Sequence, residues 1–190
     1  MWMRAEKLRR RKRRRIAATS RGLFFDKPRF CNLPNYLSSS IRTAVRAVII
    51  HDGRLLVVKM KDRDGIFYIL PGGGQKPGET FFETLKRECM EEVGVDVRIG
   101  DFLFVREYIG RNHVFRYRHS NFHQVETVFR CEIEDPSKVR VGDLQDMRQV
   151  GVAWLPLEEL PETRFFPQVL TGFFKNGQLD VPCHYLGDVN

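Results

Sequence analysis

Three glutamates in one short segment have the spacing that metal-ion chemistry requires. Glu88, Glu91 and Glu92 lie three and four residues apart, so in a helix their carboxylates share one face. Carboxylates this close repel one another unless a cation lies between them. Hard oxygen ligands suit Mg²⁺ or Mn²⁺, which keep some of their waters and bridge to substrate phosphates. The segment therefore predicts a divalent-metal site for a phosphate-containing substrate.

The elements around these glutamates would hold them in place. A helix is expected from about Thr80 to Val93, ended by Gly94. Its opposite face is apolar and would pack against a sheet, through Phe82, Leu85, Cys89 and Val93. Ahead of the helix, Pro71 and three glycines end a short strand, and glycine lets the backbone approach a metal or a phosphate closely.

An ordinary solvated helix is the alternative, and a bare pair of glutamates would favour it. Here the order and spacing match the pattern G-x5-E-x7-R-E-U-x-E-E-x-G-U, where U is a bulky aliphatic residue, and chance would produce this match on the order of 10⁻⁷ times per chain. The matching residues are Gly73, Glu79, Arg87, Glu88, Glu91, Glu92, Gly94 and Val95. Cys89 replaces the first U, and because cysteine packs as a small hydrophobe, the site is expected to survive.

This pattern is the signature of the Nudix (MutT-like) hydrolases, which the chain resembles over about residues 42–175. The hairpin AVRAVIIHDGRLLVVK resembles the opening strands of that family, and WLPLEEL resembles its C-terminal strand-to-helix passage. The resemblance implies an α/β (α+β) fold, an α/β/α sandwich with a mixed sheet in which the signature forms a loop–helix–loop. It also implies a metal-dependent pyrophosphohydrolase that cleaves a diphosphate linkage in a nucleotide-like substrate.

The resemblance assigns roles to the signature residues. The catalytic set would be Arg87, Glu88, Glu91 and Glu92, and the three glutamates would bind Mg²⁺ or Mn²⁺ together with the Gly72 carbonyl. Glu88 is the first candidate for deprotonating the attacking water. The orienting residues would be Gly73, Glu79 and Gly94. The metal would polarise the phosphoryl oxygens and help to form hydroxide.

Members of the family often take a further acidic ligand or base from a loop after the signature. Asp146, a few residues before Trp154, is the first candidate, and Glu126 is the second. No motif fixes either position, and an acidic residue on a polar loop is more often just solvated.

Substrate phosphates could meet a basic loop between two expected strands, Phe102–Tyr108 and Gln124–Glu134. The loop and its flanks carry cations at Arg106, Arg111, His113, Arg116, Arg118, His119 and His123. Arg111, Arg116 and Arg118 are the candidate phosphate ligands, although a solvated basic loop remains the alternative. Nearby aromatic residues could stack on a base or pack in the fold: Tyr108, Phe115, Tyr117 and Phe122. Residues typical of Nudix subgroups are absent, which leaves a nucleoside triphosphate or another nucleoside diphosphate derivative as substrate.

The remaining elements follow from hydrophobic alternation and turn residues. Strands are expected at Ala44–Ile50, Arg54–Lys59, Ile66–Leu70 and Val152–Leu155. Asp52-Gly53 predicts a two-residue hairpin turn between the first two. A helical turn is expected from Pro156, and a second short helix over Phe165–Phe174.

Charge divides the chain into an arm and a domain. Residues 1–40 hold 12 Lys/Arg and 2 Asp/Glu of the chain's 32 and 24, which leaves 20 basic and 22 acidic residues, a net charge of −2, in the remainder. Seven consecutive cations, residues 9–15, repel one another and predict a disordered basic arm over 1–40. A Nudix domain is expected over 41–180 and a C-terminal tail over 181–190.

The arm supports a rival reading, in which the Nudix fold is a binding module and residues 9–15 make non-specific, salt-sensitive contact with RNA or DNA. It could also be a nuclear signal or an inessential extension. No stretch is apolar and long enough to cross a membrane, and the N-terminus lacks the apolar segment of a secretory signal, so the cytoplasm is the expected location. The four cysteines form no CxxC pair and are expected to be buried free thiols. The sequence does not decide whether the protein is a monomer or a homodimer.

Overall fold

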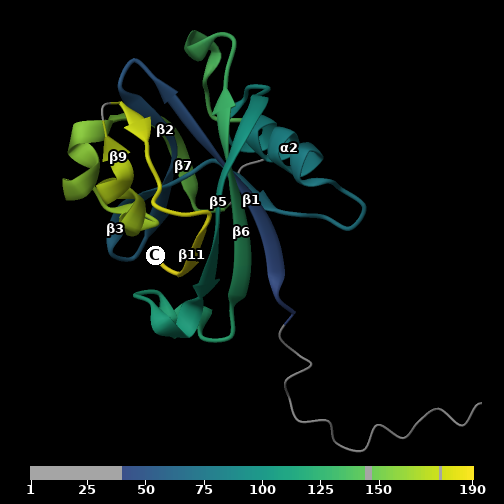
Figure 1. The fold of residues 1–190 in the computed structure, drawn as a ribbon, viewed down its shortest axis with the longest axis vertical. Helices are drawn as coiled ribbons and strands as arrows, with labels where there is room; N and C mark the ends of the chain where they lie inside the picture. The colour runs from purple at the N-terminus through teal and green to yellow at the C-terminus, as the bar shows by residue number, and fades with distance from the viewer. Residues whose placement is uncertain (1–39, 144–146, 176) are drawn as a thin grey trace, which may run out of the picture. The chain divides into compact units, whose positions relative to one another are not determined.

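A mixed β-sheet and a helix beside it dominate the computed structural model, which describes residues 40–190 apart from 144–146 and 176 (Figure 1). The first half of this part contains β1 (Arg42–His51), β2 (Arg54–Asp62), β3 (Gly65–Ile69), β4 (Gly72–Gly74), α2 (Phe81–Val93) and β5 (Arg98–Ile109). The second half contains β6 (His123–Glu132), β7 (Gln149–Pro156), β8 (Phe165–Phe166), β9 (Phe174–Lys175), β10 (Gln178–Leu179) and β11 (Tyr185–Asp188).

The sheet is mixed, as the resemblance implied, because it contains both parallel and antiparallel pairs. The order is β11-β5-β6-β1-β2-β3-β8, with β4 also paired to β1 and β7 to β2. β1 runs parallel to β6 at the centre, and β5 runs antiparallel to β6. The predicted hairpin turn is confirmed, since Asp52 and Gly53 both have positive φ (46° and 69°) and Ile50 faces Leu55 across it.

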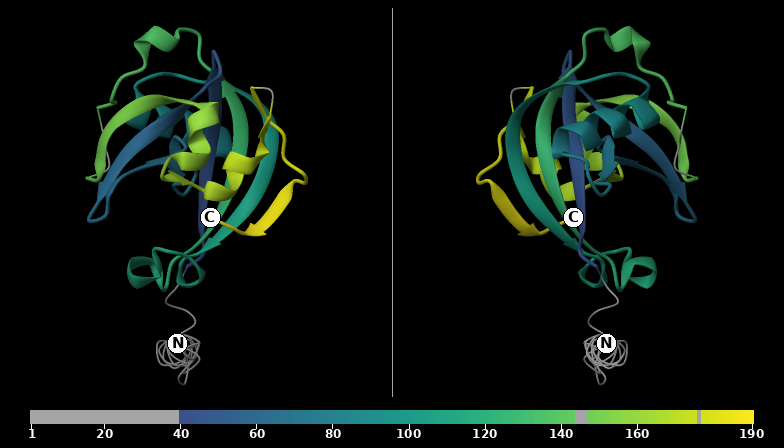
Figure 2. Two further views of the ribbon diagram at one scale, coloured as in Figure 1. Left: turned by 90° about the vertical axis from the view of Figure 1, so that its left-hand side faces the viewer. Right: turned by 90° about the vertical axis from the view of Figure 1, so that its right-hand side faces the viewer.

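Helical elements cover both faces of the sheet. Seen from one side, the 3₁₀ helices η4 (Leu157–Glu162) and η5 (Gln168–Phe173) lie in front of the strands, and from the opposite side α2 does (Figure 2). Successive side chains of β1 point to opposite faces of the sheet and so contribute to both layers of the core. Val45 and Ile49 pack with the α2 layer, and Val48 packs with the opposite one. The predicted sandwich is therefore present.

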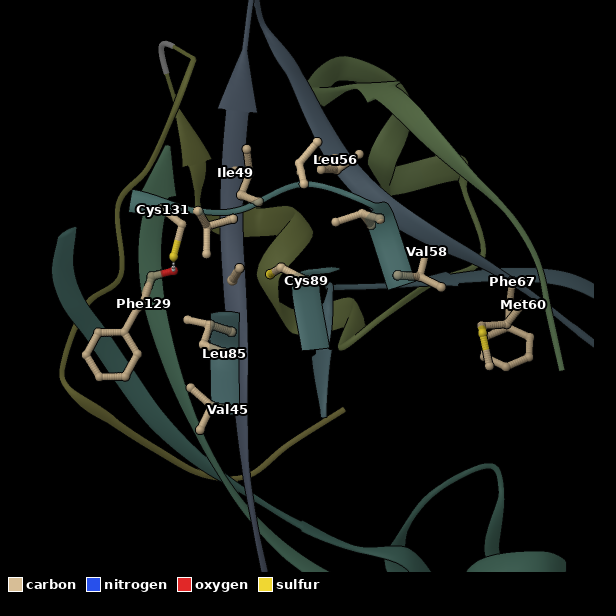
Figure 3. Packing of buried hydrophobic residues seen from close by; sticks show 14 residues of the cluster. Val45, Ile49, Leu56, Val58, Met60, Phe67, Leu85, Cys89, Phe129 and Cys131 are labelled. Atoms are coloured by element: carbon tan, nitrogen blue, oxygen red, sulfur yellow. Dashed lines mark hydrogen bonds between the residues drawn. The ribbon is translucent and has the colours of Figure 1, made fainter. Parts of the chain in front are cut away.

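The apolar face of α2 anchors the signature segment. Leu85, Cys89 and Val93 are fully buried. Figure 3 shows Leu85 and Cys89 among strand residues such as Val45, Ile49 and Cys131. Burying one such aliphatic side chain contributes roughly 1.5–3 kcal/mol. The helix is thus a rigid support for whatever its other face carries, and Cys89 packs as expected of a small hydrophobe.

Both ends of α2 are fixed by local chemistry. Thr80 accepts a hydrogen bond from the Glu83 amide and the Glu83 side chain accepts one from the Thr80 amide, which forms a capping box. Gly94 ends the helix in the left-handed region at φ 68°, where a Cβ would lie 2.9 Å from Cγ of Arg140. The predicted helix bounds are confirmed.

The structure differs from the expectations in five places. Phe82, expected on the buried face of α2, is 52% exposed and contacts the sheet through the ring of Phe129. Residues 165–174 are not one short helix, because Pro167 interrupts them between β8 and η5. Within the expected tail, Tyr185–Asp188 forms β11 and pairs with β5. Gly72–Gly74 pairs with β1 as β4 and is not a loop. Cys183 is exposed, unlike Cys89 and Cys131. In the described residues no helix is long and apolar enough to cross a membrane, and the arm lies outside them.

Candidate active site

The signature helix forms one wall of a cleft of about 740 Å³. Glu88, Glu91 and Glu92 line it together with the three glycines of β4. Several residues of the segment 110–122, which joins β5 to β6 and which we call the lip, also line the cleft. The cleft therefore brings the predicted metal site and the predicted basic loop to one place.

Arg87 makes hydrogen bonds to three other residues of the signature segment and to β4. Its Nε and Nη2 donate to the two carboxylate oxygens of Glu79 at 2.7 and 2.9 Å, a bidentate pair. Its Nη1 donates to Glu88 at 2.6 Å and to Glu91 at 3.2 Å, and Nη2 also donates to the Gly74 carbonyl. One guanidinium thus fixes two of the three predicted metal ligands relative to β4.

Glu79 holds Arg87 from the loop before the helix. The hydrogen bonds from Arg87 lower the pKa of Glu79 from 4.5 to about 2, against the opposing effect of burial. Its carboxylate also accepts from the Lys76 amide at 3.1 Å and from the Thr84 hydroxyl at 3.0 Å. The geometry gives Glu79 an orienting position behind the carboxylates that face the cleft.

Two glycines of β4 are required by close packing. A Cβ on Gly72, whose φ is 124°, would lie 2.1 Å from the Val45 carbonyl oxygen. A Cβ on Gly73 would lie 2.4 Å from the carboxyl carbon of Glu88. The Gly72 amide donates to Glu92 at 2.8 Å, so β4 and α2 lock together at the predicted ligands. Glu92 is the most buried of the three glutamates, with only 9% of its surface exposed.

The donor set fits a hard divalent cation. Carboxylate oxygens of three glutamates share the cleft with a backbone segment of glycines. Among the described residues, no three acidic, histidine or cysteine side chains are arranged so that they could hold a metal ion by themselves. An incomplete protein shell of oxygen ligands suits Mg²⁺, because this ion keeps several waters and completes its octahedron with substrate phosphates.

The two candidates for a downstream acid have different outcomes. Asp146 lies outside the described residues. Glu126 lies on β6 and lines the cleft, but it is only 3% exposed and is already engaged. Arg106 donates to it at 2.6 Å, Arg46 at 3.2 Å and Gln124 at 2.6 Å. Burial would raise the pKa of Glu126, but the charges of Arg106 and Arg46 outweigh burial and lower it.

Only part of the predicted basic loop reaches the cleft. Arg118 lines it, whereas Arg111 and Arg116 are exposed and are not among the lining residues. His119 also lines it, but burial, followed by the nearby charges of Arg148 and Arg118, lowers the pKa of His119 below 6.5. At neutral pH His119 therefore adds little positive charge.

Aromatic residues form a further part of the cleft lining, which we call the aromatic wall. All four aromatic candidates from the sequence line it, namely Tyr108, Phe115, Tyr117 and Phe122. Phe67 and Phe166 join them, with the rings of Phe115 and Phe166 5.0 Å apart. Tyr117 is 77% exposed at the mouth. This aromatic wall offers apolar ring surface in the same cleft as the three glutamates.

Sequence reasoning missed Arg46, which lines the cleft from the centre of β1. Its guanidinium donates to the carbonyls of Leu70 and Gly72 as well as to Glu126. The signal was available: an arginine interrupts the apolar run AVRAVII at a position that alternation places on the same face as Val48. A cation in a central strand is costly unless it has partners there.

Comparisons with known proteins agree with this site. The chain matches the family model of the NUDIX domain over residues 40–171. It is 32% identical over 124 residues to "Nucleoside triphosphatase NudI" of Salmonella agona (strain SL483), a match that covers 63% of this chain and 84% of the relative.

Solved structures share the fold. A MutT NUDIX hydrolase from Burkholderia pseudomallei superposes with a TM-score of 0.55 at 24% identity, covering 70% of this chain and 95% of that one. A NUDIX hydrolase from Nitrosomonas europaea gives a TM-score of 0.56 at 17% identity, covering 78% and 80%. With the signature intact and its Glu88, Glu91 and Glu92 in one cleft, the chain belongs to the Nudix family and is a Nudix pyrophosphohydrolase.

Proposed function

We propose that the protein hydrolyses a nucleoside triphosphate, or a related nucleoside diphosphate derivative, with Mg²⁺ or Mn²⁺ held by Glu88, Glu91 and Glu92. One observation carries the proposal: the three carboxylates and six aromatic side chains line a single cleft. Phosphates would lie toward the glutamates and the base toward the rings. The similarity to a nucleoside triphosphatase favours this substrate class.

The signature residues would hold the metal, whose charge polarises the phosphoryl oxygens and lowers the pKa of bound water. Arg87 keeps Glu88 and Glu91 pointing into the cleft. The Gly72 amide does the same for Glu92. Because these contacts exist before any substrate arrives, little reorganisation remains for the reaction itself.

Glu88 is the proposed base that takes the proton of the attacking water. Its Oε1 accepts from Arg87, while its Oε2 has no hydrogen bond within the described part of the chain. Glu126 is a weaker candidate, because two guanidinium groups hold its carboxylate and lower its pKa. Gly73 supports the assignment, since the space that its missing Cβ leaves is needed by the Glu88 carboxyl group.

A nucleotide panel tests the proposal. Purified full-length protein is assayed for release of phosphate and diphosphate from nucleoside triphosphates and diphosphate derivatives, with Mg²⁺ or Mn²⁺. We expect hydrolysis that stops in excess EDTA and returns with metal. Full turnover in chelator would exclude the metal assignment.

Charge-neutral variants test the residues. Glu91→Gln and Glu92→Gln keep the side-chain volume and remove a ligand charge, so turnover should fall on the order of 10²–10³-fold. Glu83→Gln is the matched control, because it lies on the same helix outside the signature and glutamine still completes a capping box. Equal losses at all three positions would mean that general helix charge, and not metal binding, is being measured.

A further inference from the structure

Two arginines and one glutamate form a buried charged floor in the cleft. Glu126 on β6 lies between Arg46 on β1 and Arg106 on β5, and it accepts hydrogen bonds from both. Their side chains are 17%, 7% and 4% exposed for Arg46, Arg106 and Glu126. All three line the cleft. The charged floor therefore spans three neighbouring strands of the sheet and faces the substrate space.

The guanidinium groups keep donors to spare. Arginine has five N–H groups. Arg46 uses its Nε on Glu126 and its Nη1 on the Leu70 and Gly72 carbonyls, while its Nη2 has no hydrogen bond within the described residues. That nitrogen is not fully buried, and because Arg46 lines the cleft, we take it to be accessible from there. Arg106 uses its Nε and its Nη2 on the same oxygen of Glu126 and its Nη1 on the Val189 carbonyl, so one N–H on each of Nη1 and Nη2 is left.

The charges in this floor do not cancel. Two guanidinium groups face one carboxylate, and the further negative charges that act on Arg46 are those of Glu92 and Glu88. Those two glutamates are the proposed metal ligands, so a bound divalent ion would take up their charge. One positive charge would then remain in a nearly buried place, which is unfavourable unless an anion meets it there.

We infer that Arg46 and Arg106, held in position by Glu126, bind the phosphate chain of the substrate on the floor of the cleft. The inference rests on the proposed function for its substrate class. Arg46 contacts Gly72, next to the glutamates, whereas the Arg106 guanidinium lies 5.9 Å from the Tyr108 ring, toward the aromatic wall. The phosphate chain therefore runs from the metal site past Arg46 and Arg106 toward the rings. This assignment replaces Arg111 and Arg116 of the lip as phosphate ligands.

Binding of inorganic pyrophosphate with Mg²⁺ tests the assignment without turnover. Calorimetric titration of the full-length protein is compared with Arg46→Gln and Arg106→Gln, whose folding is checked by circular dichroism. Loss of a charge-assisted hydrogen bond at either position should weaken pyrophosphate binding about 10- to 100-fold. Arg46→Lys should recover only part of the affinity, because lysine keeps the charge but loses the planar fork.

Arg98→Gln is the matched control. Arg98 lies on β5 like Arg106, but its side chain is 81% exposed and pairs with Glu132 outside the cleft. Its removal changes the net charge equally and should leave pyrophosphate binding within about twofold. Folded Arg46→Gln and Arg106→Gln variants with wild-type affinity would overturn the assignment.

A second measurement covers variants that fail to fold when Glu126 loses a partner. In the wild-type protein, NMR signals of the arginine Nε–H groups are followed during titration with pyrophosphate and Mg²⁺. Signals of Arg46 and Arg106 should shift with saturation, while that of Arg98 should not. Unshifted floor signals at saturating pyrophosphate would overturn the assignment. If no nucleotide is hydrolysed but pyrophosphate binding still depends on the floor, only the proposed function is wrong.

Discussion

Arg87 shows how one residue sets the positions of several carboxylates in this cleft. It contacts two of the three glutamates proposed to bind metal, and Glu79 holds it with two hydrogen bonds. A guanidinium fork matches carboxylate geometry in a way that a lysine ammonium does not. The position of the carboxylates is therefore set by a planar, permanently charged group and not by helix geometry alone.

Gly73→Ala should separate activity from stability. The new Cβ would meet the Glu88 carboxyl group at 2.4 Å, so that side chain must move while the rest of β4 stays paired. Because a misplacement of about 1 Å at a reacting group costs about 10²-fold in rate, we expect a loss of that size. Steady-state kinetics and thermal unfolding measure the two effects.

Gly151→Ala is the control for that substitution. A Cβ there would lie 3.7 Å from the nearest atom, Cδ of Lys59, which is ordinary contact, and β7 lies away from the signature. Its activity should equal that of the wild type. A Gly73→Ala variant with full activity would show that Glu88 is not confined by β4.

The Glu79–Arg87 pair predicts a pH dependence of stability. Arg87 lowers the pKa of Glu79 from 4.5 to about 2 in the folded chain. The pair therefore stabilises the folded state fully above pH 4.5, and this stabilisation is lost as the pH falls toward about 2. In thermal unfolding, the difference in Tm between wild type and Glu79→Gln should narrow over that range.

Glu134→Gln, an exposed position after β6, is the control and should follow the wild type at every pH. A constant Tm difference between wild type and Glu79→Gln down to pH 2 would contradict the assignment of the contact.

Single residues also mark the limit of sequence reasoning here. The signature residues could be named from spacing alone because they are local: one helix and one turn bring them together. The floor could not, because Arg46 and Glu126 are 80 residues apart and meet only when β1 pairs with β6. Glu126 could be ranked as an acid near the site, but not as a carboxylate held by two arginines.

At the scale of elements, the start of the lip is held in place by β11, a strand far away in the sequence. Asp188 at the end of β11 accepts from the Ile109 amide at 2.8 Å and from the Asn112 side chain at 2.6 Å, and its carboxylate lies 2.6 Å from Nε2 of His113. The ring of His113 stacks on Tyr108 at 5.0 Å. One carboxylate thus holds the start of the lip against β5.

Asp188→Ala should loosen the lip and weaken substrate binding. Loss of these three contacts removes the anchor but leaves the glutamates untouched, so KM should rise several-fold while kcat changes less. Amide hydrogen exchange over residues 110–122 should become faster. Asp180→Ala, an exposed aspartate after β10, should change neither quantity. Unchanged exchange in the lip of Asp188→Ala would show that β11 does not hold it.

The strength of the local pattern decided which elements could be predicted. The β1–β2 hairpin and α2 had turn, capping and periodicity signals that agreed with each other. YLGD, the sequence of β11, is a four-residue stretch without alternation, and it becomes a strand because β5 offers a free edge. Phe165–Phe174 looked helical from its apolar residues, but Pro167 limits the segment to a two-residue strand and a 3₁₀ turn.

For the whole chain, charge separates the arm from the catalytic domain. A variant that begins at Ser40 loses 12 of 32 basic and 2 of 24 acidic residues, so its formal net charge changes from +8 to 20 − 22 = −2. It keeps β1 and every residue proposed to act. We expect nucleotide hydrolysis close to that of the full chain. Nucleic-acid binding by the full chain, if carried by residues 9–15, should weaken steeply with salt and be nearly lost in the variant.

Both proteins are tested in two assays. Filter binding at several salt concentrations measures nucleic-acid binding, and the nucleotide assay measures hydrolysis. A shortened protein that is folded but inactive would place part of the active site in the arm. Salt-sensitive binding that persists in the shortened protein would show that the basic residues of the domain carry it.

The parallel pairing of β1 with β6 has a consequence for the order in which this protein acquires its parts. The β1–β2 hairpin closes a loop of two residues, whereas the floor must bring together Arg46 and Glu126 across 80. Loop-closure entropy makes such distant contacts late and slow to form. On a growing or refolding chain, we therefore expect the hairpin to form before the cleft. The protein should then become active only after β1 has paired with β6, and an isolated β1–β2 hairpin should lack activity.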